Sequence, residues 1–339
     1  MLDTCSVRGM EFKILDGNSH LSDHKFIFLA SQPRSGSTML QAILGTHSRI
    51  HTSSEPWIAF YPLLAFKKGA IEAIINADWA STGMEAFLGE NQISRSFYEE
   101  KAGEFIAAFY NQALEKSGKD IFLDKTPRYY EILPELARVF PASKIILLQR
   151  DPLWVIKSIL KSWVKEESSR LFYYTRDLFS AIDQILEFKL NSPGNQLSLK
   201  YEDLTAEPER QVQDICGFLG IEYESAMLNY ERNPDWVFGD KNFLGAEAIK
   251  KAGNFNSEFS QLSQLHLNFV YFYLMELGEH RYDAFGYDFD SAYAQIKALK
   301  PSSEGWDMWR SIVDTRQFLS MNESYSDFHY KMMLNHSDP

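Results

Sequence analysis

The chain of 339 residues lacks several features that mark specialised classes of protein. Its two cysteines, Cys5 and Cys216, are too few for a disulfide framework. No apolar run approaches the roughly 18 residues of a membrane span, and no charged start precedes an apolar core. An excess of positive charge is also missing, since 46 acidic residues against 34 basic ones give a formal net charge of −12. These absences predict a cytoplasmic chain with no membrane span and no nucleic-acid partner.

A Walker A loop, with a lysine directly after its glycine, is also missing. In its place, residues 31–38 read Ser-Gln-Pro-Arg-Ser-Gly-Ser-Thr, between an apolar run at 26–30 and a helical pattern at 37–46. Strand, tight loop and helix together form a phosphate cradle, because backbone N–H groups and the helix dipole point at one spot. Arg34 precedes the glycine, which suggests a nucleotide whose reacting group is not the γ-phosphate of Mg-ATP.

Apolar runs alternate with helical patterns, and 45% of the residues are hydrophobic, enough for a sizeable core. We expect strands at residues 26–30, 121–123, 144–149 and 196–201. We expect helices at residues 37–46, 130–140, 152–165, 170–190 and 208–220. This alternation predicts an α/β fold of the P-loop type, in which helices flank a central parallel sheet in three layers. Ligands of such folds collect beyond the carboxyl ends of the strands.

The pattern along the chain suggests three parts. Residues 1–24 are polar and mixed, which predicts a loose arm before a main domain at 25–290. Residues 291–339 form a helical extension, either a terminal helix docked on the domain or a substrate cap or dimer contact. Inside the main domain, residues 57–118 predict a helical insert rich in aromatics. This insert is either ordinary helix core or the wall of an apolar substrate pocket.

Two charged segments follow the second and third expected strands. Arg150 follows strand 144–149, and Ser158 lies two turns into the next helix, so the two can clamp one phosphate. The alternative is a capping ion pair between Arg150 and Asp151. Lys125 lies at the end of the second strand and places a cation at the same edge of the sheet.

A carboxylate follows the first helix, in the segment Ser53-Ser54-Glu55-Pro56-Trp57. Glu55 at this position can face the anion site across a bound substrate, or it can simply stabilise a helix start. His51 lies four residues earlier and can assist it, although a lone histidine is more often structural. No Cys/His spacing in the chain predicts a metal site.

Together these segments resemble the superfamily of sulfotransferases that use 3′-phosphoadenosine 5′-phosphosulfate (PAPS). Residues 31–38 are similar to the family's 5′-phosphosulfate loop, and residues 144–158 to its 3′-phosphate segment. A third block, Leu199-Lys200-Tyr201-Glu202-Asp203-Leu204 with the helix after it, also matches. The resemblance covers roughly residues 25–290.

The resemblance assigns roles to single residues. Cytosolic members carry a catalytic histidine after Lys-Thr, where this chain has Pro127. Bacterial and tyrosylprotein members instead place a glutamate after the first helix, which Glu55 matches, so Glu55 is implied as the base. Arg34 and Lys125 are implied as donors to the sulfonate and leaving oxygens. The implied nucleotide-binding residues are Arg34, Ser35, Gly36, Ser37, Thr38, Arg150, Ser158, Tyr201, Asp240 and Asn242.

The resemblance also implies a reaction: in-line transfer of the sulfuryl group of PAPS to a hydroxyl, without a metal, leaving 3′-phosphoadenosine 5′-phosphate (PAP). The acceptor is a small molecule or a carrier-bound group, such as a β-hydroxyacyl chain on a carrier protein. One alternative is a P-loop small-molecule kinase, against which the missing Walker lysine counts. Another is a non-catalytic nucleotide-binding protein, which would need neither Glu55 nor Lys125.

Overall fold

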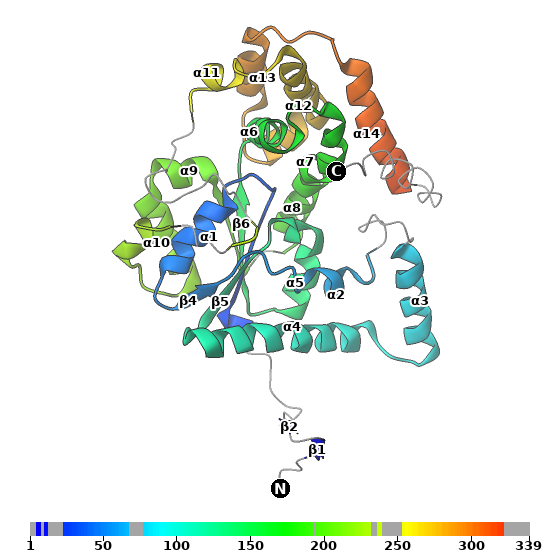
Figure 1. Cartoon of the computed structure of the whole chain (residues 1–339), viewed down its shortest axis with the longest axis vertical. Coiled ribbons are helices and arrows are strands. Elements are labelled where there is room, and N and C mark those ends of the chain that lie inside the picture. The colour runs from blue at the N-terminus through cyan, green and yellow to red at the C-terminus, as the bar shows by residue number, and fades with distance from the viewer. Residues whose placement is uncertain are drawn as a thin grey trace.

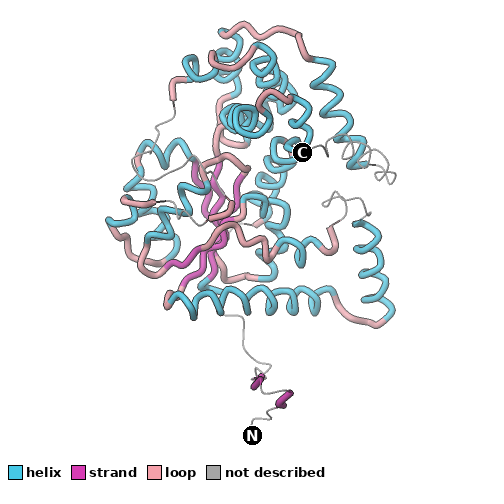
Figure 2. The backbone as a smooth tube through the Cα atoms, viewed as in Figure 1, coloured by secondary structure: helices cyan, strands magenta, loops and turns pink. Residues whose placement is uncertain are grey.

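The computed structural model describes residues 5–7, 10–12, 23–67, 77–192, 194–231, 236–238 and 253–321. It confirms the expected α/β fold, in which helices cover both faces of a central sheet (Figure 1). The sheet has five parallel strands in the order β4–β5–β3–β6–β7. These are β3 (Phe26–Ser31), β4 (Ile50–Thr52), β5 (Ile121–Lys125), β6 (Lys144–Gln149) and β7 (Gln196–Lys200). Two short antiparallel strands, β1 (Cys5–Val7) and β2 (Met10–Phe12), lie near the N-terminus, apart from this sheet (Figure 2).

The central strand β3 divides the core into two layers because its side chains alternate between the faces of the sheet. Phe26, Phe28 and Ala30 belong to the larger apolar cluster, and Ile27 and Leu29 to the smaller one. The larger cluster includes α4 (Arg95–Ser117), α5 (Leu133–Val139), α6 (Pro152–Ile159), α8 (Ser180–Asn191) and α12 (Gln264–Ala284). The smaller includes α1 (Ser37–Thr46), α9 (Tyr201–Ala206) and α10 (Pro208–Leu219).

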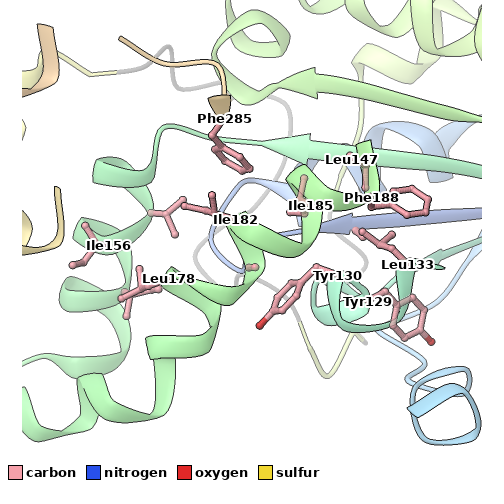
Figure 3. Packing of buried hydrophobic residues seen from close by; sticks show 14 of the residues in the cluster. Tyr129, Tyr130, Leu133, Leu147, Ile156, Leu178, Ile182, Ile185, Phe188 and Phe285 are labelled. Carbon is pink, nitrogen blue, oxygen red and sulfur yellow. The ribbon is translucent and has the colours of Figure 1, made fainter. Parts of the chain in front are cut away.

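Helix α8 shows how the larger layer is filled (Figure 3). Its residues Ile182, Ile185 and Phe188 are at most 2% exposed and pack in the same cluster as Leu147 of β6 and Leu133 of α5. Apolar side chains at this spacing form one face of a helix, which explains why the helix lies flat on the sheet.

The structure corrects three details of the expected elements. Strand β4 was not anticipated, because three residues carry too little pattern. The helix expected at 170–190 is broken into η4 (Ser168–Tyr174), α7 (Thr175–Leu178) and α8. The backbone departs from helical dihedral angles at Tyr174, with φ of −115° and ψ of 2°, and φ reaches −106° at Phe179. The helix expected at 130–140 begins as η2 (Pro127–Ile132) and continues as α5.

The expected insert and extension are both helical where they are described. The insert contains α2 (Phe60–Leu64), α3 (Ala77–Glu90) and α4, and the extension contains α13 (Phe289–Ala298) and α14 (Trp306–Met321). Tyr110 and Ile106 of α4 belong to the core, whereas Trp79 and Phe87 of α3 are exposed. The aromatics of the insert therefore serve only in part as core. The remaining short helices are η1 (Asp23–Lys25), η3 (Leu160–Val164), η5 (Ser225–Leu228) and α11 (Phe255–Phe259).

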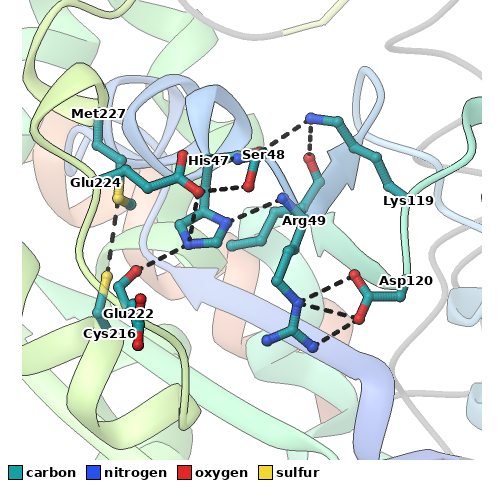
Figure 4. Close-up of polar contacts among 10 residues, drawn as sticks. His47, Ser48, Arg49, Lys119, Asp120, Cys216, Glu222, Glu224 and Met227 are labelled. Carbon is teal, nitrogen blue, oxygen red and sulfur yellow. Dashed lines mark hydrogen bonds and ion pairs between the residues drawn. The ribbon is translucent and has the colours of Figure 1, made fainter.

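A polar cluster at the amino ends of the strands joins the turn after α1 to the loop after α10 (Figure 4). The ring of His47 lies 3.0 Å from the carbonyl oxygen of Glu222, and the N–H of Ser48 donates to Glu224 at 2.9 Å. Arg49 pairs with Asp120 at 2.6 Å. Because the phosphate-cradle sequence lies at the opposite ends of the strands, we assign this cluster a structural role.

Cys216 of α10 gives a direct test of this packing. It is 1% exposed, and its Sγ lies 3.8 Å from Sδ of Met227. Burial, with a contribution from Glu224, raises the pKa of its thiol to about 11. Because the thiolate is the reactive form, we expect Cys216 to resist iodoacetamide at about pH 8 until the protein is denatured. Mass spectrometry of the Cys216 peptide checks this, and rapid labelling of the folded protein would contradict it.

Candidate active site

The loop after β3 has the backbone of a phosphate cradle. Gly36 caps α1 with φ of 93°, and its carbonyl accepts from the N–H of Met39 and of Leu40 at 3.0 and 3.2 Å. N–H groups of a first helical turn have no partner within the helix, and they carry the positive end of its dipole. The Oγ of Ser35 is buried without a hydrogen-bond partner among the described residues. A buried donor beside a helix start fits an anionic ligand.

Tyr201 of α9 closes one side of this loop. A Cβ placed on Gly36 would lie 2.4 Å from Cδ2 of the Tyr201 ring, so the ring rests directly on the glycine. The guanidinium of Arg150 lies 4.4 Å from the centroid of the same ring, which is cation–π distance. The structure therefore brings Gly36, Tyr201 and Arg150 together.

Arg34 and Ser158, which the sequence singled out separately, are hydrogen-bonded. Nε of Arg34 donates to Oγ of Ser158 at 3.0 Å, and a terminal nitrogen donates to Ser162 at 3.3 Å. Arg34 has φ of 71°, a strained value for a non-glycine residue and one often found at functional sites. Its carbonyl accepts from Arg150 at 3.0 Å.

Arg150 also carries an orphaned donor. Its Nε is buried with no hydrogen-bond partner among the described residues. A buried guanidinium nitrogen without a partner is costly unless a ligand supplies the acceptor. This observation fits the phosphate clamp expected from Arg150 and Ser158. Asp151 instead caps α6 by accepting from the N–H of Leu153 at 2.8 Å.

Lys125 and Glu55 form the second part of the site. Nζ of Lys125 donates to Oε1 of Glu55 at 2.8 Å, and the two side chains are 1% and 11% exposed. Removing either partner would leave a poorly hydrated charge, which typically costs several kcal/mol, about 3–5. The contact thus holds a carboxylate and an ammonium together at the carboxyl edge of the sheet, in register with β3 at Leu29.

Hydrogen bonds at both ends hold the segment that carries Glu55. On one side, the amide of Gln41 donates to Oγ1 of Thr52 at 2.8 Å, and Thr52 donates to the carbonyl of Leu123 at 2.8 Å. On the other side, the N–H of Ala59 donates to the hydroxyl of Tyr129 at 3.2 Å. The segment is therefore fixed to α1, β5 and η2 at once.

Trp57, between these two anchors, has φ of 58° and a buried indole N–H with no hydrogen-bond partner among the described residues. Both a strained backbone and an orphaned donor are typical of binding sites. The sequence identifies Trp57 only as an aromatic residue, and its buried indole N–H without a partner could not be predicted from the sequence.

Asp124, directly before Lys125, is the residue of this region that sequence reasoning missed. It is fully buried and accepts from Thr126 at 2.8 Å, from Tyr110 at 2.5 Å and from Tyr129 at 2.9 Å. Burial raises its pKa to about 6, although the three hydroxyl donors and Lys125 act in the opposite direction. The one signal in the sequence was a carboxylate directly after the apolar run at 121–123 and next to Lys125.

The remaining expected residues are placed as follows. Ser37 and Thr38 are buried in the first turn of α1. His51 packs its ring on Phe122 at 5.7 Å, and its side chain makes no hydrogen bond among the described residues, so the contact with Glu55 that its assisting role needs is not seen. Asp240 and Asn242 lie outside the described residues.

Comparison with known proteins gives one family. A model described as "Sulfotransferase family" matches residues 27–225, more than half of the chain. A putative protein-tyrosine sulfotransferase of Caenorhabditis briggsae is 26% identical over 215 residues, covering 61% of this chain and 69% of its own length. The nodulation protein NoeE of Sinorhizobium fredii is 26% identical over 251 residues, covering 66% of this chain and 57% of its own.

Among solved structures, the sulfotransferase domain of the Synechococcus PCC 7002 olefin synthase is similar, with a TM-score of 0.48 and 21% identity. The similarity covers 78% of this chain and 94% of that domain.

The contact between Gly36 and Tyr201 predicts the effect of one methyl group. Alanine at Gly36 must adopt a left-handed φ, costing about 1 kcal/mol, and must also displace the ring. Gly118 has φ of 67° and no atom within 4 Å of the point where a Cβ would lie, so Gly118→Ala carries the φ cost alone. We expect Gly36→Ala to lower the free energy of unfolding by at least about 1 kcal/mol more than Gly118→Ala, because the ring must also move. Urea unfolding measures both, and equal losses would contradict the contact.

The raised pKa of Asp124 predicts a pH dependence of stability. Because the folded state binds this proton more tightly than the unfolded state, the contribution of Asp124 falls as pH rises through about 6. Between about pH 5 and pH 7.5 the loss is on the order of 1 kcal/mol. We expect the stability difference between wild type and Asp124→Asn to shrink by this amount over that range. A difference that stays constant in urea unfolding at both pH values would contradict the assignment.

Proposed function

This chain belongs to the sulfotransferase family, and we propose that it transfers the sulfuryl group of PAPS to a hydroxyl by in-line displacement. The observation that carries the proposal is the buried contact between Lys125 and Glu55 at 2.8 Å, at the sheet edge from which the phosphate loop also departs. An acceptor hydroxyl must lose a proton while the leaving phosphate oxygen gains charge. A carboxylate can accept this proton, and a neighbouring cation can stabilise the charge on the leaving oxygen.

The residues of the cradle fit an adenosine bisphosphate with anions at both ends. Ser35, Gly36, Ser37 and Thr38 surround the helix start, which suits a 5′-phosphate. The orphaned Nε of Arg150, close to Arg34 and Ser158, suits a second phosphate at the 3′ position. Tyr201, stacked between the loop and Arg150, lines the nucleotide.

In this mechanism Glu55 accepts the proton of the acceptor hydroxyl as its oxygen forms the new bond to sulfur. The bond between sulfur and the bridging oxygen breaks, and its electron pair stays on the departing phosphate. Lys125 stabilises that developing charge and, before reaction, holds the Glu55 carboxylate in place. Arg34, anchored by Ser158 and Ser162, is our second donor to the sulfonate. The protein's own cations thereby stabilise the negative charge that Mg²⁺ stabilises in kinases.

The acceptor is a hydroxyl on a small molecule or on a carrier-bound chain such as a β-hydroxyacyl group. The orphaned indole N–H of Trp57, two residues after Glu55, supports an acceptor with a polar oxygen. No described helix is both long and apolar enough to cross a membrane. The cytoplasmic location expected from the sequence stays a prediction.

Substitution of the two central residues tests the proposal. We expect Glu55→Gln and Arg34→Ala each to lower transfer from PAPS at least ~100-fold without added Mg²⁺, because a base or a charge-stabilising donor is lost. Glu100→Gln, on the exposed face of α4, is the matched control and should keep full activity. A panel of hydroxyl acceptors read by mass spectrometry provides the assay.

Three outcomes would contradict the proposal. Wild-type turnover in both Glu55→Gln and Arg34→Ala would remove these residues from the mechanism. Calorimetric preference for Mg-ATP over PAP would instead favour the kinase alternative. Tight PAP binding with no transfer to any acceptor would favour a non-catalytic nucleotide-binding protein.

A further inference from the structure

Two reciprocal ion pairs connect η2 to α7, close to the Lys125–Glu55 contact. Arg128 of η2 donates to both carboxylate oxygens of Asp177, at 2.9 and 2.6 Å. Arg176 of α7 donates to Glu131 of η2, at 2.7 Å to each oxygen. The Asp177 and Glu131 side chains are 2% and 4% exposed. Each element thus contributes one arginine and one carboxylate, and the two ion pairs hold η2 and α7 together.

The two arginines differ in what surrounds them. Glu131, the partner of Arg176, also accepts from Gln184, and Lys67 lies 4.0 Å away. Arg128, in contrast, lies three residues after Lys125, and 36% of its side chain is exposed. It binds Asp177 through Nε and one terminal nitrogen, and its other terminal nitrogen makes no hydrogen bond among the described residues. One edge of this guanidinium therefore remains available to a ligand.

The available edge belongs to a guanidinium whose position is fixed. Asp177 also accepts from the hydroxyl of Tyr130 at 2.7 Å, and its backbone carbonyl accepts from the Gln32 amide at 2.9 Å. Gln32 lies two residues before Arg34 in the phosphate loop. Arg128 is thus connected through Asp177 to the same loop that we propose holds the nucleotide, so little side-chain entropy remains to be lost on binding.

Nearby negative charges favour the charged form of Arg128. Burial opposes its charge, but the hydrogen-bonded Asp177 and the nearby negative charge of Glu55 outweigh burial and raise the pKa of Arg128. In a chain of net charge −12, a fixed cation at this point is suited to receive an anionic group.

We propose that Arg128 is a further substrate-contacting residue, whose available guanidinium edge binds a non-bridging oxygen of the sulfuryl group beside Glu55 and Lys125. The inference rests on the proposed function. Guanidinium is suited to this task, because its planar fork matches an oxyanion while the opposite edge stays on Asp177. The Arg176–Glu131 pair joins the same two elements through the same kind of contact, and it serves as the structural control.

The test compares two ligands that differ in the sulfuryl group. PAPS carries this group and PAP lacks it, so the ratio of their dissociation constants reports contacts to it. We expect Arg128→Gln to weaken PAPS about tenfold and PAP less than about twofold, because one charge-assisted hydrogen bond is lost. Arg176→Gln, which breaks the control pair, should leave the ratio unchanged. Calorimetry with each ligand measures the ratio, and thermal unfolding confirms that both variants fold.

Arg128→Lys keeps the inference testable if Arg128→Gln does not fold. Lysine retains the positive charge but cannot form the paired hydrogen bonds of a guanidinium. We therefore expect the ratio of the PAPS and PAP dissociation constants to change about threefold. A ratio equal to that of wild type in either Arg128 variant, or an equal change in Arg176→Gln, would overturn the inference and leave a structural clamp. Failure of both nucleotides to bind the wild-type protein would instead overturn the proposed function.

Discussion

The buried contact between the ammonium of Lys125 and the carboxylate of Glu55 is the constraint on which the rest of the site depends. An unpaired charge at either position would be poorly hydrated, and separating the two side chains would therefore be unfavourable. Gln41, Thr52 and Tyr129 fix the segment around Glu55, and the sheet register fixes Lys125. The fold thereby holds a carboxylate and an ammonium group in contact at the carboxyl edge of the sheet.

The parallel sheet explains why the other parts of the site meet there. Because β3, β5 and β6 end at one edge, the loop with Gly36, the Lys125 segment and Arg150 converge without long connections. Tyr201, after β7, adds a ring that only a glycine at position 36 can accommodate. Asp177 then connects the loop, through Gln32, to Arg128. Each contact involves residues far apart in sequence, so the site is a product of topology.

The sequence predicted the parts of the molecule with strong local signals. Continuous apolar runs identified β3, β5 and β6, alternating apolar residues identified β7, and the Ser/Gly loop between strand and helix identified the cradle. Strand β4 was too short to recognise. The helix at 170–190 was expected to be continuous because the local sequence does not show that Asp177 is buried against Arg128 and Tyr130, which lie far away along the chain. Asp124 and Arg128 were missed for the same reason, since their meaning lies in tertiary partners. The roles of Glu55, Lys125 and Arg34 stay predictions, and Asp240 and Asn242 lie outside the described residues.

The most direct test of the central claim is a crystal structure of the protein with PAP bound. The account predicts that the 5′-phosphate lies on the N–H groups of residues 35–38 and faces Lys125, with Glu55 across the remaining space. It also predicts that the 3′-phosphate contacts Arg150. A nucleotide bound with its 5′-phosphate directed away from Lys125 and Glu55 would contradict the claim that these two residues mark the point of transfer.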